Sequence, residues 1–184
     1  MITLITGCMF AGKTTTAINL SDQDGSCLYF KPIIDDRYSA DDVVTHDNKR
    51  RPAMVLKNIT DCDNYFLNSK LAHCILIDEL QFFDDFIIQA IKEASKMGYH
   101  VYITCLNYWA DGSKPTILEE LRKIEGINEI KLRARCYECQ EPADYTAKMV
   151  GSLEQIIEVG GANLYKPMCK KHFRLFRRKQ KGVK

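Results

Sequence analysis

Residues 7–14 of this 184-residue chain read Gly-Cys-Met-Phe-Ala-Gly-Lys-Thr, which fits the pattern G-x-x-x-x-G-K-[ST]. They follow an apolar run and precede a helix-like stretch, as a phosphate-binding loop requires. Backbone N–H groups of such a loop bind phosphate oxygens. The alternative interpretation is an ordinary glycine-rich turn between a strand and a helix. The pattern predicts binding of a nucleoside triphosphate by Gly7, Cys8, Met9, Phe10, Ala11, Gly12, Lys13 and Thr14.

Two of these residues are expected to have distinct chemical roles. The Lys13 amine would reach the β- and γ-phosphates, and the Thr14 hydroxyl would bind Mg²⁺. The sequence therefore predicts a site for a triphosphate together with its magnesium ion.

A pair of acidic residues follows the apolar run of residues 74–77. A strand in this context carries its carboxylate to the sheet edge beside the phosphate loop. Because consecutive side chains of a strand point to opposite faces, Asp78 is expected to act on the Mg²⁺ shell and Glu79 on a substrate hydroxyl. Glu79 is thus a candidate general base. The alternative is that both acids only end a strand, with Asp84 and Asp85 capping the next helix.

Four residues in the second half have the spacing of metal ligands. Cys136 and Cys139 form a C-x-x-C pair, and Cys169 and His172 form a C-x-x-H pair thirty residues later. Two such pairs are typical of a structural zinc site with four protein ligands, which leaves no open position for catalysis. Free thiols or a redox-active C-x-x-C are the alternatives, but a redox pair does not need the second motif.

Strand-like and helix-like stretches alternate through the first 125 residues. Apolar runs predict strands, and apolar residues at helical spacing predict helices. This alternation predicts an α/β fold, a P-loop (RecA-like) parallel sheet flanked by helices. The expected strands are 2–6, 27–30, 53–56, 74–77 and 99–104, and the expected helices are 13–20, 83–97 and a third that opens at 113–115.

The pattern changes after about residue 127. Residues 130–134 alternate like a half-exposed strand, and short β-like pieces follow at 144–149 and 154–159. We predict a P-loop nucleotide-binding domain over 1–129, a β-rich zinc-binding domain over 130–173 and a basic, flexible tail over 174–184. Residues 160–168 are expected to form a loop, anchored at Cys169, that folds over a substrate. The tail is either solvated or in nonspecific contact with a phosphate backbone.

The composition excludes several classes of protein. Hydrophobic residues make up 46% of the chain, which is enough for a core, and the net charge of +2 makes no case for an acidic or nucleic-acid partner. Apolar runs are too short to cross a bilayer, and no signal-peptide pattern is present. We therefore expect a cytoplasmic protein, in which the five cysteines outside the metal motifs stay reduced.

Together these motifs resemble the type II thymidine kinase family over nearly the whole chain. Residues 7–14 resemble its phosphate loop, and residues 31–38, Lys-Pro-Ile-Ile-Asp-Asp-Arg-Tyr, are similar to its K-P-x-x-D-x-R-Y segment. Residues 45–46 match its [ST]-H, and residues 78–83, Asp-Glu-Leu-Gln-Phe-Phe, match its D-E-x-Q-F-F. The metal motif and the segment Val159-Gly160-Gly161-Ala162 with Tyr165 resemble its zinc-bound substrate lasso.

The resemblance implies transfer of the γ-phosphoryl group of ATP to the 5′-hydroxyl of thymidine or deoxyuridine. It implies Mg²⁺, structural Zn²⁺, a homotetramer and feedback inhibition by dTTP. Glu79 matches the catalytic base, Arg37 and Lys13 match further catalytic residues, and Asp35 and Gln81 match nucleotide-binding positions. Without the resemblance, Asp35 and Arg37 would be interpreted as surface charges. The positions matched to substrate binding are Phe82, Leu106, Ile156, Ile157, Glu158, Val159, Gly160 and Tyr165.

One segment departs from the family pattern L-D-x-x-F-x-x-x-P-F. Residues 106–115 read Leu-Asn-Tyr-Trp-Ala-Asp-Gly-Ser-Lys-Pro, so Asn107 replaces the aspartate and Ala110 stands at the position of a substrate-contacting phenylalanine. Tyr108 and Trp109 are the candidates for the missing ring. This departure leaves the base specificity open.

Two other classes of function compete with the kinase. One is a zinc-ribbon P-loop ATPase or nucleic-acid-binding module, although 184 residues leave little room for coupling domains. The other is a kinase-like sensor without activity. The presence of Lys13, Thr14, Arg37 and Glu79 argues against that sensor, since each group that the chemistry needs is in the sequence.

Overall fold

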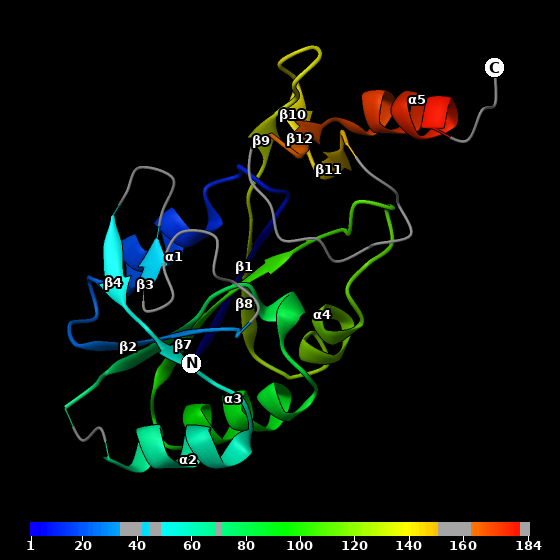
Figure 1. The fold of residues 1–184 in the computed structure, drawn as a ribbon. Coiled ribbons are helices and arrows are strands. Elements are labelled where there is room, and N and C mark those ends of the chain that lie inside the picture. Colours follow the sequence, from blue (N-terminus) through cyan, green and yellow to red (C-terminus); the bar gives the residue numbers. More distant parts are fainter. Residues whose placement is uncertain (34–41, 45–48, 69–70, 151–162, 181–184) are drawn as a thin grey trace.

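A six-stranded parallel sheet forms the centre of the protein (Figure 1). The computed structural model describes residues 1–33, 42–44, 49–68, 71–150 and 163–180. The strands lie in the order β5-β2-β6-β7-β1-β8, and all neighbours run in the same direction. Their bounds are β1 (Ile2–Gly7), β2 (Cys27–Lys31), β5 (Met54–Val55), β6 (Cys74–Ile77), β7 (His100–Leu106) and β8 (Ile127–Lys131). The carboxyl ends of all six strands therefore share one edge, and the predicted α/β class is confirmed.

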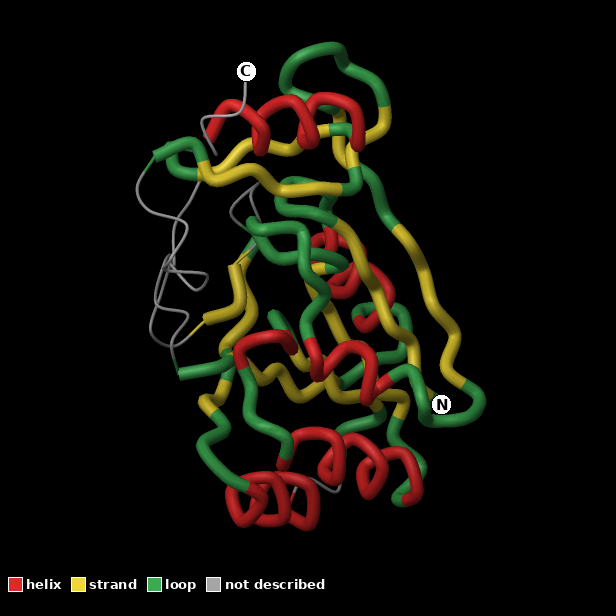
Figure 2. Tube along the Cα trace, turned by 90° about the vertical axis from the view of Figure 1, so that its right-hand side faces the viewer, coloured by secondary structure: helices red, strands yellow, loops and turns green. Residues whose placement is uncertain are grey.

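Helices cover both faces of this sheet. Helix α1 (Lys13–Ser21) packs on one face, where Ala17 and Ile18 contact the buried side chains of Ile5 and Leu76. The opposite face is covered by α2 (Ile59–Asn68), α3 (Phe86–Lys96) and α4 (Thr116–Leu121), as the side view shows (Figure 2). Because both faces are covered, the four residues of β6 are all fully buried, which explains their uninterrupted apolar run.

A second, smaller unit lies beyond the carboxyl edge of the sheet, at the top of Figure 1. We call the described parts of residues 134–180 the C-terminal unit. It pairs β9 (Ala134–Arg135) with β10 (Pro142–Ala143), and β11 (Tyr145–Lys148) with β12 (Tyr165–Met168), both antiparallel. Helix α5 (Lys170–Gln180) follows. A small core that includes Ala147, Met168 and Phe173 holds these elements together.

The C-terminal unit differs from the sequence-based expectation in three places. The boundary expected between residues 129 and 130 falls inside β8, which pairs with β1. Of the alternating residues 130–134, the first two thus belong to an edge strand of the main sheet, and Ala134 begins β9. Residues 165–168, expected in a loop, form β12, and residues 174–180, expected as a flexible tail, end α5. That helix is stabilised by burial of Phe173 and by the bond from Gln180 Nε2 to the Lys148 carbonyl oxygen (3.2 Å).

Several elements gave no clear signal in the sequence. These are α2, the short 3-10 turn η1 (Leu80–Phe82), which delays the start of α3, and the hairpin of β3 (Asp42–Val44) with β4 (Arg50–Pro52). The hairpin is attached to the end of α1 by ion pairs of Lys49 and Arg51 with Asp22 (3.2 and 2.7 Å). The β-like piece expected at 154–159 lies outside the described residues. Within the described part of the chain, every helix is too short or too polar to cross a bilayer.

Candidate functional site

The phosphate-binding motif connects β1 to α1 as the sequence predicts. Gly7 ends β1, and a Cβ atom on it would lie 2.8 Å from the carbonyl oxygen of Leu132, so the close approach of the two chains requires glycine. Gly12 has a φ of 80° and precedes the first turn of α1. The Lys13 side chain is buried, and its Nζ donates a hydrogen bond to the carbonyl oxygen of Cys8 (3.3 Å). The loop therefore places a cation at the start of α1.

Asp78 connects the phosphate loop to the acidic strand end. The Thr14 hydroxyl donates to its two carboxylate oxygens at 3.1 and 3.3 Å. Strand β7 lies between β1 and β6, and the Thr104 hydroxyl on β7 donates to Asp78 Oδ1 at 2.5 Å. The structure thus brings Thr14 and Asp78 together although 64 residues separate them.

Glu79 has an unusual backbone that neighbouring groups hold in place. Its φ of 54° lies in the left-handed region, which costs a non-glycine residue about 1–3 kcal/mol. Its N–H donates to the Thr104 hydroxyl oxygen (2.9 Å), and its carboxylate accepts a hydrogen bond from Gln81 Nε2. Gln81 Oε1 in turn accepts from the N–H of Leu106 (3.0 Å). Asp78 and Glu79 therefore have different side-chain partners, although both follow the end of β6 and the left-handed backbone of Glu79 is not that of a strand.

The Cys105 thiol is an ionisable neighbour of Glu79. Burial raises the pKa of this thiol, and the negative charge of Glu79 raises it further. Cys105 is fully buried, so it stays a neutral thiol at ordinary pH.

Of the substrate positions that the resemblance implies, three lie in described parts. Leu106 and Tyr165 are buried, and the Phe82 ring lies 5.9 Å from the Trp109 ring, measured between centroids. The Tyr108 ring instead stacks on Tyr145 in the C-terminal unit at 4.6 Å. Trp109 is therefore the aromatic neighbour of Phe82. The residues outside the described parts are Asp35, Arg37, Ile156, Ile157, Glu158, Val159 and Gly160.

The C-terminal unit contacts the phosphate loop directly. The Met9 N–H donates to the Thr146 hydroxyl oxygen (3.0 Å), and the Cys8 thiol donates to the Ala143 carbonyl oxygen (3.3 Å). Sequence reasoning missed both Thr104 and Thr146. The signal available was a hydroxyl residue inside a strand, which is too common to identify a site.

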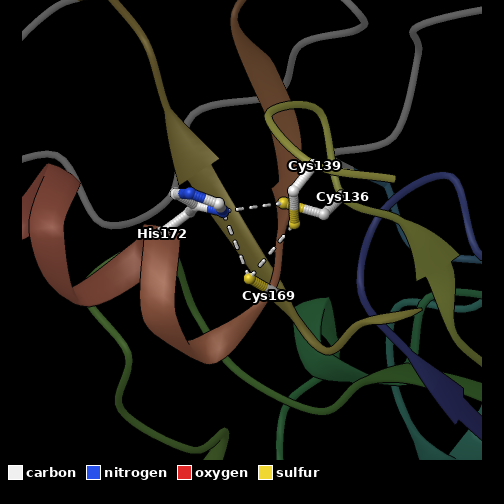
Figure 3. Close-up of side chains that lie close together, drawn as sticks. All are labelled: Cys136, Cys139, Cys169 and His172. Atoms are coloured by element: carbon white, nitrogen blue, oxygen red, sulfur yellow. Dashed lines mark hydrogen bonds between the residues drawn. The ribbon is translucent and has the colours of Figure 1, made fainter. Parts of the chain in front are cut away.

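The four predicted metal ligands lie together in the C-terminal unit, where their side chains point toward a common centre (Figure 3). Their ligand atoms all lie within 4.8 Å of one another. Cys139 Sγ lies 3.9 Å from Cys169 Sγ, and His172 Nδ1 lies 3.6 and 3.4 Å from the sulfurs of Cys136 and Cys169. A tetrahedral zinc, with bonds of ~2.3 Å to sulfur and ~2.0 Å to nitrogen, separates its ligands by roughly 3.5–3.8 Å. The cluster could hold such an ion.

The cluster also favours the thiolate form of one ligand. Burial raises the pKa of the Cys136 thiol, but backbone hydrogen bonds from Cys169, Glu138 and Cys139 lower it, with a smaller contribution from His172. The net result is a pKa of about 6. Since metals bind the thiolate, this environment prepares Cys136 for a cation.

Comparison with known proteins identifies the family. The family model described as thymidine kinase matches residues 1–173. The thymidine kinase of Thermococcus kodakarensis is 32% identical over 182 residues, covering 92% of this chain and 91% of the relative. The chain belongs to the thymidine kinase family. A second member, the thymidine kinase of Mycoplasma capricolum, is 32% identical over 188 residues, covering 94% of this chain and 88% of the relative.

One solved structure with a partial likeness is the ATPase DotB of Legionella pneumophila. It matches with a TM-score of 0.40 and 22% identity, over 68% of this chain and 34% of the DotB chain. The assignment to the thymidine kinase family rests on the sequence matches and not on this likeness.

The shared role of Thr104 predicts the effect of removing its hydroxyl. In Thr104→Val the buried Asp78 carboxylate loses a donor and the Glu79 N–H loses its acceptor, so unfolding free energy should fall by about 1–3 kcal/mol. Thr104→Ser keeps the hydroxyl and serves as the matched control, with a smaller loss. Urea denaturation followed by circular dichroism measures both. Equal stability of Thr104→Val and the unmodified protein would contradict this role.

Proposed function

We propose that this member of the thymidine kinase family transfers the γ-phosphoryl group of ATP to the 5′-hydroxyl of thymidine or deoxyuridine. The products are dTMP, or dUMP, and ADP. The observation that carries the proposal is the convergence of the phosphate loop and the acid pair, through the hydrogen bonds of Thr14 and Thr104 to Asp78. A kinase needs a loop that binds the triphosphate and a proton acceptor close to it. Glu79 meets the second requirement because it directly follows Asp78, which bonds to the phosphate loop.

The phosphate loop supplies the groups that bind the triphosphate in this proposal. Backbone N–H groups at the start of α1 hold phosphate oxygens, and Lys13 neutralises charge between the β- and γ-phosphates. The oxygens of Thr14 and Asp78 are 3.1 Å apart and suit the preference of Mg²⁺ for oxygen ligands. Thr14 and Asp78 would hold a Mg²⁺ ion, which would supply positive charge to offset the negative charge of the phosphates.

Glu79 is the general base in this proposal. Its carboxylate accepts the proton of the 5′-hydroxyl as that oxygen bonds to the γ-phosphorus and the bond to the β–γ bridging oxygen breaks, which leaves ADP. Gln81 holds the Glu79 carboxylate by the hydrogen bond from Nε2, and Thr104 holds the Glu79 backbone. Arg37 stabilises charge on the transferring oxygens, and Asp35 acts near the phosphates, on the strength of the family motif alone.

We assign nucleoside recognition to Phe82, Leu106, Tyr165 and the segment of residues 156–160, through backbone groups that read the edge of the pyrimidine. The family has a substrate-contacting phenylalanine at the position of Ala110. The contact between the rings of Phe82 and Trp109 supports the idea that Trp109 supplies the missing aromatic ring. The homotetramer and feedback inhibition by dTTP rest on the family resemblance, and the cytoplasmic location rests on the composition and the sequence pattern.

The metal cluster is proposed to bind a structural zinc ion. Three thiolates and one imidazole use all four tetrahedral positions, so the ion would fix the C-terminal unit and take no part in the chemistry. Because Cys8 and Met9 bond to that unit, the zinc would also support the phosphate loop.

A panel of nucleosides tests the proposed reaction. With ATP and Mg²⁺, thymidine and deoxyuridine should be phosphorylated, and deoxycytidine should be turned over far more slowly because its amino group reverses the hydrogen-bonding edge of the base. Formation of ADP and of the labelled monophosphate measures the rates. Equal rates on deoxycytidine would reject selectivity for thymine and uracil over cytosine, and no turnover of any nucleoside would reject the kinase.

Substitution of Glu79 tests the assignment of the base. Glu79→Gln should lower kcat by roughly 10²–10⁴-fold, because the amide cannot accept the proton, while ATP binding stays unchanged. Glu93→Gln is a matched control, since Glu93 also accepts a hydrogen bond from a glutamine, Gln89 Nε2 (2.8 Å), but on the exterior of α3. Turnover by Glu79→Gln near that of the control would remove Glu79 from the mechanism.

Substitution of a cluster cysteine tests the zinc site. Cys136→Ser should lose the bound metal and lower the melting temperature, because the remaining ligands no longer close the tetrahedron. Cys27→Ser is the control, since Cys27 is a half-buried thiol on β2 outside the cluster and should keep one zinc per chain. Elemental analysis of the purified proteins gives the result. Unchanged metal content in Cys136→Ser would reject the site.

A further inference from the structure

A cavity of about 400 Å³ lies between the segment that joins β7 to α4, the end of β8 and the C-terminal unit. Its walls carry the side chains of several basic residues. The lining that matters for the argument consists of Asn107, Lys114, Arg122, Lys131, Arg133 and Lys170. A space of this volume is large enough for a small organic ligand.

This cavity lies on the opposite face of the sheet from the helix of the phosphate loop. Side chains alternate along β1. Leu4 packs into the core beneath α3 and α4, whereas Ile5 packs against α1. Thr6, which lines the cavity, therefore faces the same side as Leu4. The cavity and the start of α1 are two separate places in the molecule.

Positive charge exceeds negative charge around this cavity. Its five cations face three carboxylates, those of Glu119, Glu129 and Asp144, which leaves an excess of two positive charges. Lys114 and Arg122 both pair with Glu119 (3.4 and 2.8 Å), and Arg122 also pairs with Glu129 (2.6 Å). The remaining pairs are Lys131 with Glu129 (3.8 Å) and Arg133 with Asp144 (2.9 Å).

Among the described residues, one of the five cations has no carboxylate partner: no ion pair involves Lys170, which begins α5. Burial raises the pKa of Glu129, but the hydrogen bonds from Arg122 and Thr6 outweigh this and hold it below its usual value, so Glu129 is ionised at neutral pH. The excess charge is thus present under ordinary conditions.

Asn107, a partly buried residue at the cavity, has an amide oxygen without a hydrogen-bond partner among the described residues. Asn107 Oδ1 is inaccessible to solvent and accepts no hydrogen bond from any described residue. Since the oxygen and nitrogen of an amide can be exchanged by a flip, the buried end can equally present N–H donors. An unsatisfied buried polar group costs about 1–3 kcal/mol, which a ligand would recover if the side chain turns this group toward the cavity. The aspartate of the family pattern at this position would instead add a negative charge.

The cavity is also bounded by aromatic rings that join the two parts of the protein. The Tyr108 ring stacks on Tyr145 with centroids 4.6 Å apart, and Tyr145 stacks on Phe173 of α5 at the same separation. Tyr108 and Tyr145 both line the cavity. A molecule bound here would contact the sheet domain and the C-terminal unit at once.

We propose that this cavity is a second anion site, which binds a phosphate group carrying two negative charges, either free or as part of a phosphorylated small molecule. The excess of two positive charges matches such a dianion, and guanidinium, ammonium and amide groups are the donors that phosphate oxygens prefer. The site is independent of the proposed catalytic reaction, because it shares no residue with the phosphate loop.

Titration calorimetry on the full-length protein tests this site. ADP with Mg²⁺ is kept at saturation so that the phosphate loop is occupied, and inorganic phosphate or ribose 5-phosphate is added. Both should bind with one site per chain and more weakly as NaCl rises. Tighter binding of ribose 5-phosphate would identify a phosphorylated metabolite as the ligand, and equal binding would identify phosphate alone. No binding of either probe to the ADP-saturated protein would overturn the proposal.

Three substitutions test whether phosphate binds in this cavity. Asn107→Asp adds a negative charge and should weaken phosphate binding at least about tenfold, while Lys131→Gln should weaken it roughly three- to tenfold. Lys123→Gln is the matched control, because Lys123 is as exposed as Lys131 (69% and 71%) but does not line the cavity. Thermal melting verifies that each variant is folded. Affinities of folded Asn107→Asp and Lys131→Gln equal to that of Lys123→Gln would overturn the proposal.

Discussion

The arrangement of the site depends on the hydrogen bonds that the protein donates to one buried carboxylate, that of Asp78. Asp78 is 6% exposed, and an ionised group this far from water is tolerated only with hydrogen-bond donors around it. Thr14 at the start of α1 and Thr104 on β7 supply those donors. Because the two hydroxyls come from two different elements, the carboxylate fixes the phosphate loop, the intervening strand and the acidic strand end relative to one another.

Thr104 extends this constraint to the next residue. Its hydroxyl group donates to Asp78 and accepts from the backbone of Glu79, whose left-handed conformation would otherwise be unfavourable. Gln81 then holds the Glu79 carboxylate. A strained residue held from two sides has few alternative positions, which would suit the role of proton acceptor proposed for Glu79.

The C-terminal unit has its own connection to this arrangement. The metal-ligand cluster links the turn after β9 to the end of β12 and the start of α5. Residues close to that cluster in the fold, Ala143 and Thr146, accept hydrogen bonds from the phosphate loop. The position of the loop is therefore coupled to the integrity of the C-terminal unit, even though no metal ligand belongs to the loop.

The sequence was sufficient to predict those parts of the protein that are defined by short local motifs. The phosphate loop, the apolar strand before Asp78 and the two ligand pairs are short motifs whose spacing follows from backbone geometry. Thr104 and Thr146 could not be predicted, since their importance comes from partners 26 and 137 residues away. The assignment of residues 130–131 to the small unit failed for a related reason: an alternating pattern predicts a strand but not the sheet in which it pairs.

The order of the strands has a consequence for synthesis on the ribosome. Strand β1 lies between β7 and β8, so its first neighbour follows it by almost one hundred residues. At a translation rate of about 5–20 residues per second, β7 is synthesised roughly 5–20 seconds after β1. Until then the strand that carries Ile2, Leu4 and Ile5 has no partner strand. During that interval the nascent chain presents an unpaired hydrophobic strand to the crowded cell, which makes it a natural client for chaperones that bind emerging polypeptides.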